Sequence, residues 1–367
     1  MLAPFGHPFY VMAKPVGSSC NLNCRYCYYL SKGKGRMTEQ LLETFIQQHI
    51  EAQTQTDILF TWHGGEPLLT PLSFYARAIE LQQQYAHGRH IDNCLQTNGT
   101  LLTDEWCAFF HKHNFLIGIS IDGPQWMHNT YRQQFDQTLQ GIRLLQKHGV
   151  EWNAMATVNH VNANHPVAFY RFFKELGCEY LQFTPVVERR EGQVTTESVT
   201  PAQWGNFLVS LYDEWIRKDV GRLFVQLFDA TLANWVGAEP GVCSMSALCG
   251  LSPALQPDGA LYCCDHFVFP EYRLGNIRQQ TLTEMVYGER QQAFGQEKRN
   301  GLSQRCRECD YLFACHGECP RNRFLPDHEN YLCDGYRQFF EHVAPTMNFM
   351  AAELAAGRSP ANVMDTI

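Results

Sequence analysis

The chain has 367 residues, of which 45% are hydrophobic and 13% aromatic, enough to bury a full core. Lys and Arg number 29 against 37 Asp and Glu, and the formal charge of −8 argues against a nucleic-acid partner that needs a broad phosphate-binding surface. No window approaches the roughly 18 apolar residues of a membrane span, and Met1–Lys14 lacks the basic start and long apolar core of a secretory signal, so we expect a cytoplasmic protein without a membrane partner.

The first half of the chain alternates short apolar runs with helical patterns. The runs typical of strands are Phe9–Ala13, Ile58–Trp62, Asn93–Thr97, Leu116–Ile121, Trp152–Val158 and Tyr180–Thr184. The helical patterns cover Thr38–Ala52, Pro71–Tyr85, Asp104–His113, with Thr103 as its cap, Thr138–His148 and Pro166–Leu176. Strands that alternate with helices predict a parallel α/β sheet with right-handed crossovers, either doubly wound or a partial barrel.

The pattern changes after Thr184. Helices are predicted over Pro201–Arg217 and Arg222–Val236, and a last helix over Tyr336–Ala356. Between them, Val242–Cys333 is irregular and rich in Gly and Cys, with few long periodic segments. Such a stretch cannot build a large core, so we expect it to need metal ligation for its stability.

Fifteen cysteines stand out in a chain without a secretory signal, because clustered thiols in a reducing compartment usually bind metal. Cys20, Cys24 and Cys27 form a C-x3-C-x2-C motif just after the first predicted strand. Iron–sulfur cubanes normally take four thiolates, so three would leave one iron open to another ligand. Zinc is the alternative for this motif, although the spacing in the first strand–helix loop favours a cluster.

A second set of cysteines is large enough for two four-cysteine clusters. Part of it has the spacing C-x2-C-x5-C-x3-C, which is similar to ferredoxin spacing, and two zinc-ribbon sites are the alternative. Cys94 and Cys107 lie in apolar runs and are interpreted as buried structural thiols. The second set comprises Cys243, Cys249, Cys264, Cys306, Cys309, Cys315, Cys319 and Cys333.

These motifs resemble a known family. The first motif resembles that of the radical S-adenosylmethionine (SAM) enzymes, and the second set resembles the SPASM auxiliary-cluster domain. More narrowly, the chain resembles the anaerobic sulfatase-maturating enzymes over nearly its whole length. The matching segments are Lys14-Pro15, Asn21-Leu22-Asn23-Cys24, Gly64-Gly65-Glu66-Pro67, Gln96-Thr97-Asn98-Gly99, Ser120-Ile121-Asp122-Gly123-Pro124, Cys264-Asp265 and Arg273-Leu274-Gly275-Asn276.

The resemblance implies a partial (β/α)6 barrel over residues 1–235, a SPASM domain over 236–335, and a C-terminal helix and tail over 336–367. It implies three 4Fe-4S clusters, of which Cys20, Cys24 and Cys27 hold the catalytic one. The nearer auxiliary cluster would take Cys243, Cys249, Cys264 and Cys319. The farther auxiliary cluster would take Cys306, Cys309, Cys315 and Cys333.

The family also implies contacts with SAM. Gly64, Gly65 and Glu66 follow the second strand, where two glycines would let the backbone approach the amino group of SAM. The other positions that match SAM contacts are Tyr26, Ser120, Arg132 and Val187. His63 stands where some relatives have Gln, and Val187 where the family usually has Leu.

Asp265 follows a cluster ligand and matches the general base of the family. The implied reaction is oxidation of a Cys or Ser side chain in a sulfatase polypeptide to formylglycine, with a one-electron donor such as flavodoxin or ferredoxin as a second partner. Two alternatives are a SPASM-type maturase that crosslinks another peptide, for example through a thioether, and a non-catalytic electron-transfer or zinc-binding protein. The sequence leaves open whether the target residue is Cys or Ser.

Overall fold

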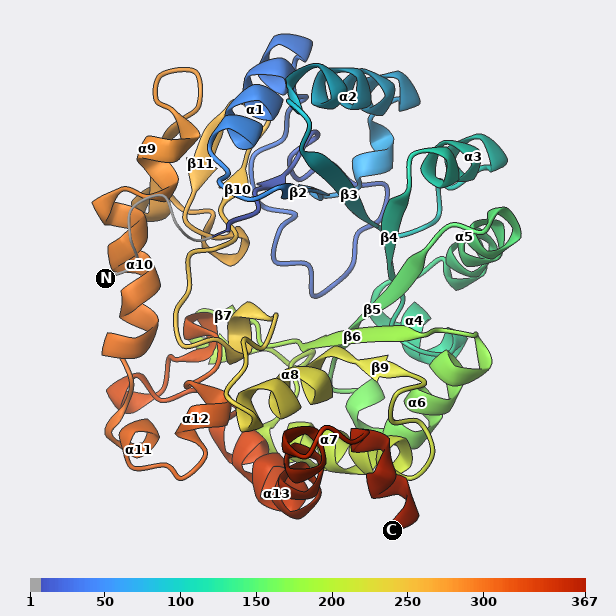
Figure 1. Ribbon diagram of the computed structural model, residues 1–367, viewed down its shortest axis with the longest axis vertical. Helices are drawn as coiled ribbons and strands as arrows, with labels where there is room; N and C mark the ends of the chain where they lie inside the picture. The colour runs from blue at the N-terminus through green and yellow to red at the C-terminus, as the bar shows by residue number, and fades with distance from the viewer. Residues whose placement is uncertain (1–7) are drawn as a thin grey trace. The chain divides into compact units, whose positions relative to one another are not determined.

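The computed structural model describes residues 8–367, so the start of the Met1–Lys14 segment lies outside the described residues. The chain forms two compact units, each assembled from distant stretches of sequence (Figure 1). The first unit comprises the chain up to Ser120, Asp136–Trp152 and Cys249–Gln296. The second comprises Ile121–Phe135, Asn153–Leu248 and Glu297–Ile367. The domain boundaries predicted near residues 235 and 335 stay a prediction.

The first unit is built on a sheet with the strand order β12-β11-β10-β1-β2-β3-β4. Strands β1 to β4 are parallel, β10 pairs parallel to β1, and β10, β11 and β12 form an antiparallel edge. The bounds are β1 Met12–Ala13, β2 Asp57–Trp62, β3 His90–Thr97, β4 Phe115–Ser120, β10 Ala254–Leu255, β11 Ala260–Tyr262 and β12 Arg273–Asn276.

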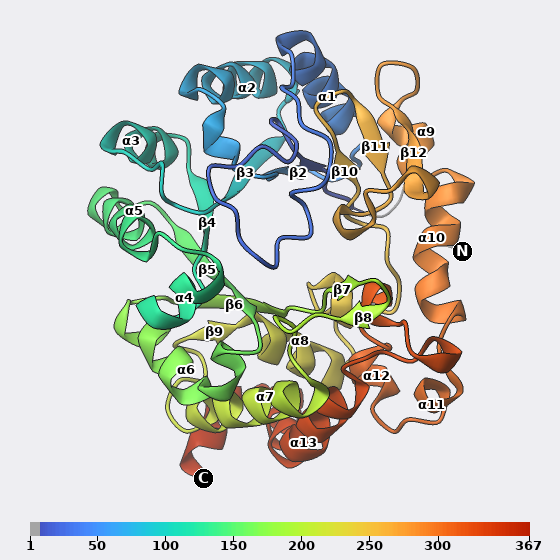
Figure 2. The same cartoon turned by 180° about the vertical axis from the view of Figure 1, so that it is seen from behind.

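Helices lie along the outer side of the parallel strands in this unit (Figures 1 and 2). They are α1 Glu39–Glu51, α2 Leu72–Tyr85, α3 Asp104–Lys112 and α5 Phe135–His148. Two more helices, α9 Leu282–Val286 and α10 Glu289–Asn300, follow the antiparallel edge, and α10 belongs to the second unit from Glu297 onward. The side chain of Thr38 caps α1 by accepting the N–H of Leu41, and Thr103 caps α3 as predicted. Phe45 of α1 and Trp62 of β2 are fully buried and pack edge to face with ring centroids 6.0 Å apart.

The second unit contains the parallel strands β5 Trp152–Val158, β6 Tyr180–Pro185 and β9 Phe224–Val225, with a small hairpin of β7 Arg189–Arg190 and β8 Gln193–Val194. Its core lies between α7, α8 and the long C-terminal helix α13, where Tyr212, Phe228 and Phe339 pack ring against ring. Its helices are α4 Gln125–Tyr131, α6 Pro166–Glu175, α7 Pro201–Ile216, α8 Gln226–Trp235, α11 Gln304–Arg307, α12 Leu312–Cys315 and α13 Cys333–Ala355. Among the described residues, no helix has the length and apolar character that crossing a membrane requires.

The start of one predicted helix is wrong, and helix α10 was not predicted. The helix predicted over Arg222–Val236 begins later, at Gln226, because Phe224–Val225 extends the parallel sheet as β9. The segment Val242–Cys333 also contains the regular helix α10, which the sequence pattern missed. The buried face of α10 consists of Gln291, Gly295 and Lys298, so it carries no apolar periodicity.

Candidate active site

The loop between β1 and α1 carries Cys20, Cys24 and Cys27. The N–H of Cys27 donates to the carbonyl of Cys24 at 3.1 Å, which closes a turn around the second cysteine. The sulfur of Cys20 accepts the N–H of Leu22 at 3.3 Å, and the amide nitrogen of Asn98 lies 3.9 Å from it. All three cysteines are thiols with partial exposure, which fits a loop that binds iron. Tyr26, between two of them, is buried.

The Gly64–Pro67 segment follows β2 and packs directly against the cysteine loop. The N–H of Gly65 donates to the carbonyl of Gly17 at 2.7 Å, and that of Glu66 to the carbonyl of Ser19 at 2.8 Å. A Cβ atom on Gly65 would lie 2.1 Å from the Ser19 carbonyl oxygen, so only glycine fits there. The glycine is therefore required by the contact between two loops, while the close approach to SAM stays a prediction.

The side chain of Glu66 is fully buried, and its carboxylate binds groups of the protein itself. Oε1 accepts the N–H of Leu68 at 2.9 Å and the hydroxyl of Thr97 at 2.7 Å. Oε2 accepts the N–H of Asn98 at 2.8 Å. These bonds join the loop after β2 to the loop after β3, so Glu66 positions both loops at the ends of the parallel strands.

Asp265 lies directly after Cys264 and is 6% exposed. The fully buried ammonium of Lys14 forms an ion pair with its Oδ1, and the hydroxyl of Tyr28 donates to its Oδ2. Lys14 Nζ also lies 4.0 Å above the ring centroid of Tyr29, whose hydroxyl donates to Gln256 at 2.7 Å. Both oxygens of Asp265 therefore have a partner that stabilises negative charge.

The charges around Asp265 favour its ionised form. Burial is the largest single influence and would raise the pKa of Asp265, but the Lys14 ammonium and the other groups around the carboxylate together outweigh burial and hold that pKa well below its usual range. Burial, together with the charge on Lys14, lowers the pKa of His63 to about 4, so His63 is neutral at pH 7. His63 Nδ1 accepts the N–H of Gly64 at 2.7 Å, which places the imidazole proton on Nε2. The site thus combines a carboxylate, an ammonium and a neutral imidazole.

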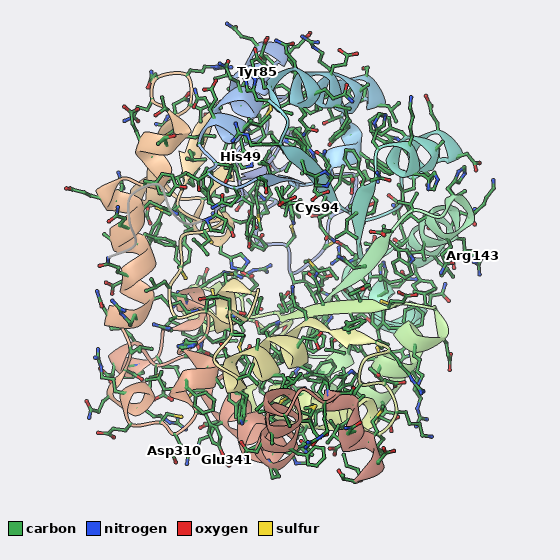
Figure 3. The ribbon with its side chains drawn as sticks, viewed as in Figure 1. His49, Tyr85, Cys94, Arg143, Asp310 and Glu341 are labelled. Atoms are coloured by element: carbon green, nitrogen blue, oxygen red, sulfur yellow. The ribbon has the colours of Figure 1, made fainter. Side chains whose placement is uncertain are left out.

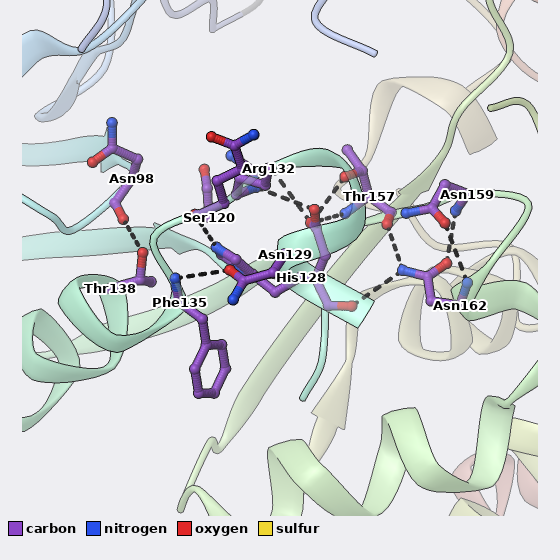
Figure 4. Close-up of polar contacts among 12 residues, drawn as sticks. Asn98, Ser120, His128, Asn129, Arg132, Phe135, Thr138, Thr157, Asn159 and Asn162 are labelled. Carbon is purple, nitrogen blue, oxygen red and sulfur yellow. Dashed lines mark hydrogen bonds and ion pairs between the residues drawn. The ribbon is translucent and has the colours of Figure 1, made fainter. Parts of the chain in front are cut away.

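The other predicted SAM contacts belong to three separate segments. Ser120 ends β4, and its hydroxyl accepts the amide N–H of Gln96 at 2.9 Å. In the second unit, the guanidinium of Arg132 follows α4 and donates to Asp122 at 3.2 and 3.4 Å, as the dashed lines of Figure 4 show. The Asp122 carboxylate also accepts the N–H and the hydroxyl of Thr157, each at 2.9 Å. Val187 is buried shortly after β6.

Four of the second set of cysteines line one cavity in the second unit. This cavity of about 220 Å³ is also lined by Tyr311, Tyr336 and Phe340. The cysteines that line the cavity are Cys306, Cys309, Cys315 and Cys333. The other four cysteines of the set do not line it: Cys243 and Cys319 belong to the second unit, whereas Cys249 and Cys264 belong to the first.

Four thiols around one cavity are the number of ligands that a cubane takes, in which each sulfur binds a different iron. Burial raises the pKa of Cys315 above its usual range, so this thiol stays protonated unless a cation replaces its proton. Within residues 8–367, no three His, Cys, Asp or Glu side chains are arranged closely enough to hold a single metal ion.

The interpretation of Cys94 and Cys107 as buried thiols is confirmed only for Cys107, which is fully buried. Cys94 on β3 (Figure 3) is partly exposed, and its thiol donates to the hydroxyl of Thr61 at 3.4 Å.

Sequence reasoning missed three residues that surround Asp265. The sequence pattern marks Lys14 only as part of a matching segment and His63 only as a difference from some relatives. It gives no role to Tyr28, although this residue directly follows Cys27. The available signal was the position of Lys14 and His63 at the ends of β1 and β2, since adjacent parallel strands bring their carboxyl ends together.

Comparisons with known proteins identify the family of the chain. The model of the radical SAM superfamily matches residues 15–173, and that of the SPASM iron–sulfur cluster-binding domain matches residues 250–310. A serine-type anaerobic sulfatase-maturating enzyme from Bacteroides thetaiotaomicron is 54% identical, with 100% of this chain and 96% of the relative covered. A serine-type enzyme from Klebsiella aerogenes is 39% identical, with 93% of this chain and 87% of the relative covered. A cysteine-type enzyme from Clostridium perfringens is 31% identical, with 93% of this chain and 97% of the relative covered.

The solved structures give the same result. The structure described as native anSMEcpe with bound AdoMet and Cp18Cys peptide has a TM-score of 0.88 at 30% identity, over 95% of this chain and all of that one. The predicted α/β partial barrel followed by a SPASM domain and a long C-terminal helix is therefore confirmed. SAM and iron–sulfur clusters are the cofactors of this enzyme class. With 54% identity over its whole length, the chain belongs to the anaerobic sulfatase-maturating enzymes, radical SAM enzymes that carry a SPASM domain.

Proposed function

We propose that this enzyme oxidises a serine side chain of a partner sulfatase to formylglycine. The observation that carries the proposal is the buried Asp265, held ionised by Lys14 directly after Cys264, in a chain 54% identical to a serine-type relative. Cysteine is the alternative target, because a cysteine-type relative is 31% identical over 93% of the chain.

The cofactors of the proposal are SAM and three 4Fe-4S clusters. Three thiols on one loop and four around one cavity support two of the cluster sites. The catalytic cluster is assigned to Cys20, Cys24 and Cys27. The nearer auxiliary cluster is assigned to Cys243, Cys249, Cys264 and Cys319 by family pattern. The farther one is assigned to Cys306, Cys309, Cys315 and Cys333.

When bound, SAM and the clusters supply the radical that takes a hydrogen atom from Cβ of the target residue and the acceptor for the electron left there. Asp265 accepts the proton of the target hydroxyl, since its carboxylate is ionised and partly accessible at the edge of its buried network. Lys14 and Tyr28 hold the two carboxylate oxygens in place, and the burial of the network keeps water away from it.

The test is an anaerobic incubation with SAM, a one-electron donor such as flavodoxin, and matched sulfatase peptides that contain Ser or Cys at the target position. We expect the Ser peptide to lose two hydrogen atoms. When the Cβ position of that Ser carries deuterium, the deuterium should be found in 5′-deoxyadenosine. Mass spectrometry reads both results. Turnover of the Cys peptide alone would reassign the target. A crosslinked peptide without formylglycine would favour the other SPASM-type maturases.

A further inference from the structure

Two buried cations in the second unit have no carboxylate partner among residues 8–367. Lys298 on α10 is fully buried, and its ammonium donates to the carbonyls of Cys243 and Ser244 at 2.7 and 2.8 Å. Arg323 is 8% exposed, and its guanidinium donates only to backbone carbonyls. Those carbonyls belong to His316, Gly317, Glu318 and Lys298.

A buried cation that meets only carbonyl groups is costly, because carbonyl dipoles do not replace a counter-charge in a medium of low dielectric constant. The carboxylate that Lys298 influences electrostatically is Glu318. The side-chain partners of Glu318, however, are the amides of Asn322 and Asn330, at 3.1 and 2.8 Å. Glu318 is thus the carboxylate that the charge of Lys298 reaches, while Arg323 meets only the backbone carbonyl of Glu318, and the two buried cations outnumber this one buried carboxylate.

The positions of these cations indicate what balances the charge. Lys298 fixes the carbonyl of Cys243, and Arg323 fixes the segment between Cys315 and Cys319. All three cysteines are assigned above to auxiliary clusters. A cubane with four thiolate ligands is an anion and becomes more negative when it is reduced. A buried cation beside it stabilises the reduced form more than the oxidised form, because charges interact strongly where water is excluded.

We propose that Lys298 is a positioning residue that supplies counter-charge to the auxiliary cluster bound by Cys243 and Cys319, and thereby raises the reduction potential of that cluster. The inference rests on the cluster assignment in the proposed function. A higher reduction potential would make this cluster a better acceptor for the electron that leaves the substrate. Arg323 links the segment before Cys319 to α10, because its guanidinium donates both to the carbonyls of residues 316–318 and to the carbonyl of Lys298.

The test is an anaerobic redox titration of the reconstituted holoenzyme without substrate, followed by electron paramagnetic resonance. In Lys298→Met we expect the potential of one auxiliary cluster to fall by at least about 59 mV, a tenfold change in its one-electron equilibrium. The other two clusters serve as internal references. Lys298→Arg keeps the charge and should restore the potential. Arg299→Met is the matched control, because it removes the same charge from the exposed neighbouring position of α10.

Unchanged potentials in a Lys298→Met enzyme that retains all its iron would overturn the inference. If both Lys298→Met and Lys298→Gln lose one cluster while Lys298→Arg keeps it, the charge is needed even to hold the cluster, which supports the inference. Loss of the cluster in all three variants would show that Lys298 acts only by its shape. Formylglycine production is scored separately with Ser peptides, so a failure of the proposed reaction is distinguished from a failure of this inference.

Discussion

The fully buried ammonium of Lys14 forms an ion pair with Oδ1 of Asp265, and this pair joins the end of strand β1 to the residue that follows Cys264. The two residues are far apart in the sequence, yet β1 and β10 pair side by side in one sheet. The pairing of these strands therefore brings the proposed base and its counter-charge together.

The first prediction concerns this ion pair. Lys14→Met leaves the Asp265 carboxylate buried with no cation against Oδ1, which typically costs about 3–5 kcal/mol of unfolding free energy. The double variant Lys14→Met/Asp265→Asn removes both charges and should recover a large part of the loss. Urea titrations under anaerobic conditions measure the three variants. Lys112→Met, at an exposed position of α3, is the control, and a Lys14→Met protein as stable as this control would contradict the prediction.

The second prediction concerns the number of clusters. Three cubanes give about twelve irons in each reconstituted chain. Cys24→Ala should fall to about eight irons and lose SAM cleavage, because the catalytic cluster has no spare thiolate. Cys333→Ala should also lose about four irons and become less soluble, since metal ligation contributes to the folding of the segment that supplies the other ligands. Iron and sulfide analysis reads both variants, and zinc in place of iron in the wild-type protein would refute the assignment.

The third prediction concerns pH and His49, which lies on α1 (Figure 3) and is fully buried. Its Nε2 bonds the carbonyl of Leu59 at 3.0 Å, and burial lowers its pKa to about 4. The imidazole of His49 therefore takes up a proton near pH 6.5 in the unfolded chain, but only near pH 4 in the folded chain. Stability due to this group is fully present above pH 6.5 and falls between those two values as the pH decreases.

Between pH 7.5 and 5.5, this effect of His49 amounts to about 1.3 kcal/mol of unfolding free energy. His49→Phe keeps a ring in the cluster with Phe45 and Phe60 and cannot be protonated. We expect the variant to lose less stability than the wild-type protein on acidification, as measured by urea titration at both pH values. His90→Phe, at an exposed position, is the control, and equal pH dependence of His49→Phe and wild type would show that His49 does not contribute.

The sequence predicted those helices and strands whose buried faces are apolar and therefore recur with a regular period. The strand Trp152–Val158 was predicted with the bounds it has, because its inward side chains alternate with partly exposed ones. Helix α10 could not be predicted in this way, since Gln291 and Lys298 on its buried face are polar and bond backbone carbonyls. The same holds for the site: the resemblance to the family pointed to Asp265, but Lys14 and Tyr28 reach it only through the pairing of distant strands.

The last prediction tests the proton step at Asp265. Asp265→Asn keeps the size of the side chain and its bond from Tyr28, but it removes the carboxylate that accepts the proton and leaves Lys14 without its counter-charge. Loss of a general base typically slows a reaction by about 10² to 10⁴. Binding of SAM and abstraction of the Cβ hydrogen precede the proton transfer, so the variant should keep its iron and still form 5′-deoxyadenosine.

The rate of formylglycine formation should fall in Asp265→Asn because the base is missing. The ratio of 5′-deoxyadenosine to formylglycine should therefore be much higher in this variant than in the wild-type enzyme. Lys14→Met/Asp265→Asn is the comparison that separates the two effects, because it removes the unpaired ammonium and leaves the base missing. A stable double variant that still produces no formylglycine assigns the loss to the missing carboxylate. Wild-type rates of formylglycine formation in Asp265→Asn would instead place the base on another group, for which the neutral His63 is a candidate.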